Sequence, residues 1–100
     1  MDLEKKRREV LRWRILQTLN AGRPYLISED LICSTVCGTD MAVTPAEIRK
    51  ELDYLEDRGL IGIKGKDEAC WSAELNRYGV DIVEYTIECE PGIARPRKYW

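Results

Sequence analysis

The stretch Thr44–Ile61, which reads TPAEIRKELDYLEDRGLI, contains sequence signals for both the start and the end of a helix. Thr44 is a good N-cap, a proline follows it at the first helical position, and Glu47 is placed to complete a capping box. Gly59 suits the left-handed residue that commonly follows a helix. The sequence therefore predicts a helix over Pro45–Arg58.

An apolar stripe lies along this helix, and the hydrophobic period then changes. Apolar residues recur at helical spacing from Ile48 to Leu55. Residues 60–63 are aliphatic, residues 64–68 are polar around a central glycine, and residues 69–75 alternate loosely. Two short runs of this kind around a polar turn predict a β-hairpin directly after the helix.

Two further helices are predicted before this stretch. The first covers Leu3–Leu19, with Asp2 as its N-cap and an apolar residue at every turn of its second half. The second covers Glu29–Cys37, where Ser28 is the expected N-cap and Gly38 the expected left-handed stop. The protein is therefore expected to place three helices ahead of the hairpin.

The C-terminal quarter predicts one more helix and an irregular tail. The helix is expected from Arg77 to Ile87, capped by Asn76, with valines and isoleucine on its apolar side. The expected division is one domain over residues 1–90 and a basic, aromatic tail over 91–100. Trp13 points away from the apolar stripe of the first helix, so it needs cover from this tail or from a partner.

The order of three helices and a hairpin resembles the winged-helix (winged helix-turn-helix) DNA-binding domain family. Thr44–Ile61 is similar to the third helix and first wing strand of many winged-helix regulators. The segments Arg77–Tyr85 and Pro91–Pro96 resemble, more loosely, small uncharacterised proteins of Mu-like bacteriophages. The resemblance implies a mostly helical α+β fold, namely a three-helix core with a β-hairpin wing, a fourth C-terminal helix and an irregular tail.

The resemblance also implies a function and the residues that perform it. It implies a small DNA-binding protein, a bacterial or prophage regulator or nucleic-acid accessory factor, whose partner is double-stranded DNA. In this family the third helix usually enters the major groove, which points to Thr44, Arg49 and Lys50. The wing usually touches the DNA backbone or minor groove, which points to Lys64 and Lys66.

Charge is unevenly distributed along the chain, although the net charge is only −2. Residues 1–25 contain seven Lys or Arg against three acids, whereas residues 26–75 contain five against eleven. A basic first helix is a candidate for contacts with DNA phosphates, and a solvated helix face is the alternative. The candidate phosphate contacts are Lys5, Lys6, Arg7 and Arg8.

The third helix carries five acids against three cations, which opposes contact with phosphates. The alternative function is therefore a winged-helix module for protein–protein interaction or dimerisation that does not bind DNA. Its contacts would lie in the basic, aromatic tail, which could instead bind nucleic acid or fold back over the first helix. Docking of this tail on a second copy would give a homodimer. The tail residues are Arg95, Arg97, Lys98, Tyr99 and Trp100.

Residues for catalysis are missing from the sequence, so we expect no enzyme, catalytic residue, cofactor or small-molecule substrate. There is no histidine to act as a general base or to activate a hydroxyl, and no glycine-rich phosphate loop. The expected location is the cytoplasm, because no apolar run could span a membrane. Four cysteines leave a thiol or metal sensor open, but their spacing favours reduced apolar thiols and no metal site. They are Cys33, Cys37, Cys70 and Cys89.

Overall fold

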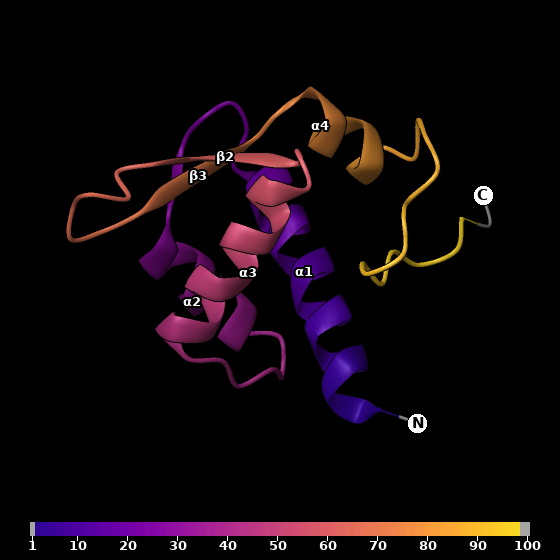
Figure 1. Ribbon diagram of the computed structural model, residues 1–100, viewed down its shortest axis with the longest axis horizontal. Coiled ribbons are helices and arrows are strands. Elements are labelled where there is room, and N and C mark those ends of the chain that lie inside the picture. The colour runs from indigo at the N-terminus through magenta and orange to yellow at the C-terminus, as the bar shows by residue number, and fades with distance from the viewer. Residues whose placement is uncertain (1, 99–100) are drawn as a thin grey trace.

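The computed structural model describes residues 2–98, and its elements follow the predicted order of three helices and a hairpin. The fold is mostly helical α+β, with the hairpin projecting past α2 and α3 and the C-terminal segment lying beside α1 (Figure 1). The elements are α1 (Leu3–Ala21), β1 (Ile27–Ser28), α2 (Glu29–Cys37), α3 (Pro45–Asp57), β2 (Ile61–Lys64), β3 (Ser72–Leu75) and α4 (Arg77–Val83).

The N-termini of all four of these helices have the caps that the sequence predicts. The side chain of Asp2 accepts a hydrogen bond from the amide of Lys5 at 3.1 Å, and Ser28 and Asn76 accept equivalent bonds in α2 and α4. Thr44 has the complete capping box with the side chain at the third helical position. These side chains satisfy amides that have no partner within the helix, and this fixes where each helix starts.

The C-termini of α2 and α3 differ. Gly59 has a φ of 81°, and the amide of Leu60 donates to the carbonyl of Leu55 at 3.0 Å, which is the Schellman arrangement predicted there. The prediction of a left-handed stop at Gly38 is wrong. Gly38 has a φ of −70°, and the chain reverses two residues later, where Asp40 has a φ of 65°.

The wing belongs to a three-stranded antiparallel sheet with the strand order β1-β3-β2. Within the hairpin, Ile61 is opposite Leu75 and Lys64 is opposite Ser72. On the other side of β3, Ile27 pairs with Ala73. The sequence did not predict β1, because a strand of two residues is too short to show an alternating pattern.

The hydrophobic core lies where α1, α2 and α3 meet and continues beneath the sheet to α4 and the tail. The apolar stripes predicted on α1 and α3 are buried in it. The largest side chains that are fully buried are Leu11, Ile15, Leu16, Leu19, Ile32, Val36, Ile48, Leu52, Leu55, Leu60 and Ile82. One continuous core therefore fixes α3 relative to both the other helices and the wing.

The fourth helix is shorter than predicted and buries a different side chain. It ends at Val83, after which Tyr85 adopts a φ of 61° and redirects the chain. Ile82 is fully buried, whereas Val80, Val83 and Ile87, which the sequence placed on the apolar side, are only partly buried.

The segment after α4 packs along α1 and covers Trp13, as the sequence required of a tail or a partner. The ring of Tyr85 meets that of Trp13 edge to face at 6.2 Å, which leaves Trp13 only 7% exposed. Farther on, the amide of Ala94 donates to the carbonyl of Glu9 at 3.1 Å, and Ile93 is buried in the core. None of the helices described is long and apolar enough to cross a membrane.

Candidate nucleic-acid interface

Helix α3 presents one face to solvent while its other faces are covered by neighbouring elements. The exposed residues of the helix fall at positions 45, 46, 50, 53 and 57. Helix α1 covers one side of α3, and the wing covers the other. Contacts on these two sides determine the charge that α3 can offer to a ligand.

On the α1 side, two acids of α3 form ion pairs with arginines. Arg7 donates to both carboxylate oxygens of Glu47 and to the carbonyl of Ala42, and its hydrogen bond lowers the pKa of Glu47. Arg12 Nε lies 2.7 Å from Glu51 Oε1, and Glu51 is only 2% exposed. Two of the five negative charges predicted to repel DNA are thus compensated internally.

On the wing side, one lysine pairs with two more acids of α3. Lys66 Nζ lies 2.6 Å from Asp53 Oδ1 and 2.9 Å from Glu56 Oε1, and these bonds, first that to Asp53, raise the pKa of Lys66. The amide of Ile63 also donates to Glu56 Oε2 at 3.0 Å. Among the residues described, Asp57 is then the one acid of α3 without an ion-pair partner.

Arg49 ties α3 to α2 and to the loop between β2 and β3. Its Nε and Nη2 each donate to Glu29 at 2.6 Å, and Nη2 also donates to the carbonyl of Ala69 at 2.9 Å. The guanidinium lies 4.6 Å from the ring centre of Trp71, on which Lys66 also stacks at 5.3 Å. The bond from Arg49 holds the pKa of Glu29 below its ordinary value.

Several cations predicted to contact DNA are thus already paired, and others are not. Arg7, Arg49 and Lys66 are held by carboxylates, as the preceding contacts show. Within residues 2–98, the side chains of Lys50 and Lys64 have no partner, and both are exposed.

The remaining candidates on α1 and α3 are also placed by the structure. Lys5 and Arg8 have side chains with no partner in the described part of the chain, and Lys6 Nζ lies 3.9 Å from Glu9 Oε1. The hydroxyl of Thr44 accepts from the amide of Glu47 at 3.2 Å, so it caps α3. Sequence reasoning did not identify the ion pair between Arg12 and Glu51, because nothing local marks two residues 39 positions apart as partners.

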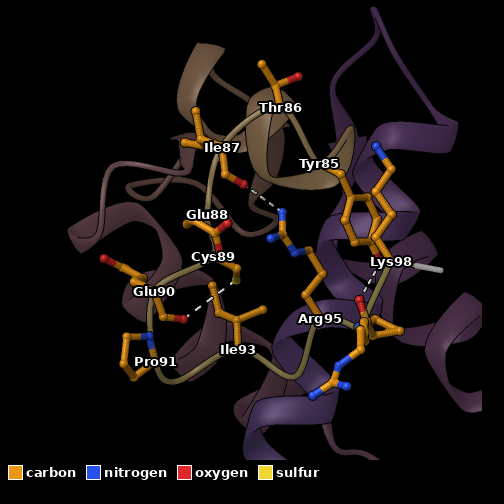
Figure 2. Close-up of a pocket in the computed structure, with 12 residues that line it drawn as sticks. Tyr85, Thr86, Ile87, Glu88, Cys89, Glu90, Pro91, Ile93, Arg95 and Lys98 are labelled. Carbon is orange, nitrogen blue, oxygen red and sulfur yellow. Dashed lines mark hydrogen bonds between the residues drawn. The ribbon is translucent and has the colours of Figure 1, made fainter. Parts of the chain in front are cut away.

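The predicted interaction tail surrounds a cavity of about 900 Å³ lined by residues from Tyr85 to Lys98 (Figure 2). Arg95 points into it, where Nη1 donates to the carbonyls of Ile82 at 2.9 Å and Ile87 at 3.0 Å. Tyr85 donates to the carbonyl of Pro96 at 2.8 Å. These bonds hold the tail to itself and to α4, whereas Arg97 is exposed and Tyr99 and Trp100 lie outside the described residues.

Three of the four cysteines lie in two separate groups of polar atoms. The thiols of Cys33 and Cys37 lie 3.9 Å and 3.7 Å from the same carbonyl oxygen of Val43, and burial raises the pKa of Cys33. Cys70 instead lies beside Glu29 and Asp30, with the three potential ligand atoms within 4.8 Å of one another. Because Arg49 binds both oxygens of Glu29, this second cluster is already neutralised in part.

Comparison with known proteins supports the fold and gives no family. No family model and no curated protein matches the chain. A solved structure, "Crystal structure of Bacillus subtilis PadR in complex with operator DNA", aligns with a TM-score of 0.60 and 23% sequence identity. The alignment covers 89% of this chain and 53% of that one, so this chain spans about half the length of its structural neighbour. The protein has a winged-helix fold, in which the β2–β3 wing directly follows α3.

Proposed function

We propose that this chain is a winged-helix regulator that binds double-stranded DNA through the N-terminal half of α3, the wing and the start of α1. Lys50 would enter the major groove from the exposed face of α3. Lys64 at the end of β2 and the pair Lys5 and Arg8 on α1 would contact phosphates. A bacterial or prophage setting stays a prediction from sequence resemblance.

The observation that carries this proposal is the neutralisation of α3. Phosphate contact supplies most sequence-independent affinity for DNA, so an acidic recognition helix would oppose binding. Four of its five acids are paired with cations from α1 and the wing, and the fifth, Asp57, is in the last turn. The N-terminal half of α3 therefore offers Lys50 without an unpaired carboxylate beside it.

The paired cations have a positioning role in this proposal. Arg49 and Lys66 hold the wing against α3, and Arg7 holds α1 against the start of α3. Rigid placement of the elements matters because side chains reach base edges only from a defined angle in the groove. The winged-helix neighbour solved with operator DNA supports DNA as the ligand class for this fold.

Salt-dependent binding to a duplex tests the proposal. We expect the protein to bind a fluorescent mixed-sequence duplex at about 50 mM salt and to lose affinity steeply by about 200 mM, as counterion release requires. The double variant K50Q/K64Q should bind more weakly and reduce the slope of log K against log salt by about 1, since Lys64 is its phosphate contact and each such contact contributes roughly 0.9. Fluorescence anisotropy measures both quantities.

Arg77→Gln is the matched control, because Arg77 is an exposed cation at the start of α4 outside the proposed interface. It should leave the salt slope unchanged. Absence of duplex binding by the wild-type chain at low salt would overturn the proposal.

A protein-interaction role is the second candidate, favoured by exposed apolar side chains around β1. Tyr25 is 74% exposed, Leu26 is 45% exposed and Leu31 is 53% exposed, all within seven residues. Neighbouring exposed apolar residues are typical of contact surfaces. If this surface joins two copies as a homodimer, sedimentation should give a dimer that Leu31→Lys converts to a monomer. A monomer at all concentrations would count against the homodimer.

A further inference from the structure

A basic pocket lies between α1, α3 and the tail, and its lining includes Arg12, the partner of Glu51. Its volume is about 330 Å³, within the range of small-ligand pockets. Four of its lining side chains are cationic and one is acidic. The lining residues are Lys5, Arg8, Glu9, Arg12, Tyr54, Arg58, Pro91 and Gly92.

The ring of Tyr54 lines the pocket, and two guanidinium groups lie over it. Arg12 lies 3.6 Å and Arg58 lies 4.8 Å from the ring centre. Arg12 is held by Glu51 at 2.7 Å and by the carbonyl of Gly92 at 2.8 Å, and Arg58 Nη1 lies 3.3 Å from Glu90. An arginine has five N–H donors, so both side chains keep donors beyond those used in these bonds.

The wall formed by the tail depends on a glycine. Gly92 has a φ of 106°, and a Cβ atom there would lie 2.3 Å from the hydroxyl oxygen of Tyr54. Only glycine allows the tail to approach the ring this closely and to present its carbonyl to Arg12. The pocket is thus a product of three segments that are distant in sequence and fixed by specific contacts.

The pocket lining also includes two cations of α1 whose side chains have no partner in the described part of the chain. Lys5 and Arg8 are three residues apart on α1, which places them on one face of the helix. Neither side chain has a partner among residues 2–98. The one acid in the lining is Glu9. Its Oε1 lies 3.9 Å from Nζ of Lys6, a lysine that does not line the pocket. Two unpaired cations, together with two guanidinium groups that each pair with one acid, leave a local excess of positive charge.

We propose that this pocket binds a phosphate-class anion, with Lys5 and Arg8 as its direct contacts and Arg12 and Arg58 as further donors from its lining. Charge-assisted and bidentate hydrogen bonds from arginine suit the oxygens of phosphate. The anion has two possible sources, a free phosphate compound or a phosphate of the DNA backbone. Binding of a free phosphate compound extends beyond the proposed function, whereas binding of a backbone phosphate rests on it.

Titration with inorganic pyrophosphate tests the site on the full chain. Amide chemical shifts of residues 5–12, 54–58, 90 and 92 should move and saturate, compared with potassium chloride at matched ionic strength. K5Q/R8Q should weaken this binding at least tenfold without loss of fold, because both side chains lack partners in the described structure. K50Q, outside the pocket, should leave it unchanged.

Titration with the mixed-sequence duplex distinguishes the two sources. Saturable pyrophosphate binding that K5Q/R8Q removes supports a free anion, and it can succeed even if the protein binds no DNA. Shifts at the pocket with duplex alone, lost in K5Q/R8Q and retained in R77Q, support a backbone phosphate. The proposal is overturned if neither ligand moves these resonances, or if the shifts are equal in wild type and K5Q/R8Q.

Discussion

The role that the sequence suggests for Arg49 differs from the contacts that its side chain makes in the structure. From its position on α3 it was a candidate for reading DNA, but three of its hydrogen bonds go to Glu29 and Ala69. The side chain of Glu29 is only 9% exposed, so the carboxylate of this pair is largely shielded from solvent. A contact of this kind stabilises the junction of α2, α3 and the wing, and DNA contact by Arg49 remains a prediction.

The Glu29–Arg49 pair predicts how stability depends on pH. The folded-state pKa of Glu29 lies below its ordinary value of 4.5, chiefly because of the bond from Arg49. Its stabilising contribution is therefore present above about pH 4.5 and is lost as the pH falls through the folded pKa. We expect E29Q to melt about 5 °C lower than wild type at pH 7, since roughly 1 kcal/mol shifts a domain of this size by about 4–8 °C.

Thermal unfolding followed by circular dichroism from pH 7 to pH 3 checks this prediction. The gap between wild type and E29Q should shrink as the pH falls below about 4.5, because protonation of Glu29 removes the charge that distinguishes the two proteins. E88Q, an exposed acid in the tail, should melt with wild type throughout. A gap that stays constant over this range would show that the charge of Glu29 is not the cause.

At the scale of the element, α3 is defined by its two ends. The capping box at Thr44 and the Schellman bonds at Gly59 satisfy backbone groups that the helix itself leaves unpaired. Both ends were predictable because each depends on residues within four positions. Gly38 was mispredicted at the end of α2 by the same reasoning, since a glycine permits a left-handed conformation without requiring one.

Loss of the capping hydroxyl should weaken the whole domain through α3. We expect Thr44→Ala to lower the free energy of unfolding by about 1 kcal/mol, the typical cost of removing an N-cap. Urea unfolding followed by tryptophan fluorescence measures the change. Thr35→Ala is the control, because Thr35 is exposed on α2 and caps nothing; an equal loss in both variants would count against the cap.

At the scale of the molecule, the tail is part of the packing that holds α1 in place. Ile93 is 8% exposed within the core, and backbone and arginine bonds join Ala94 to Glu9 and Gly92 to Arg12. The pocket proposed for a phosphate-class anion exists only because these contacts bring residues 90–92 to Tyr54. The predicted boundary between residues 90 and 91 can therefore be tested by stability.

Truncation of Ile93 should destabilise the folded domain if the tail is integral to it. We expect Ile93→Ala to cost about 2 kcal/mol or more and Ile93→Val about 1 kcal/mol, the usual losses for a buried isoleucine. Equilibrium unfolding in urea gives these values. Leu3→Ala, at a site that is 73% exposed, should change little. A stability of Ile93→Ala equal to wild type would support the tail as a separate appendage.

The sequence by itself determined where the helices start, where α3 ends, which faces of α1 and α3 are apolar, and that a hairpin follows. These properties arise from interactions between near neighbours in the chain, so they can be read from short patterns. It also identified Lys5, Arg8, Lys50 and Lys64 as candidate contacts, and their side chains are unpaired within residues 2–98.

Only the tertiary structure decided which charges remain available to a ligand. Glu51 meets Arg12 across 39 positions, and Lys66 returns from the wing to Asp53. The pairing of β1 and the closure of the pocket by Gly92 are also long-range. Charge neutralisation depends on distances between segments that a common core brings together, and no local pattern encodes those distances.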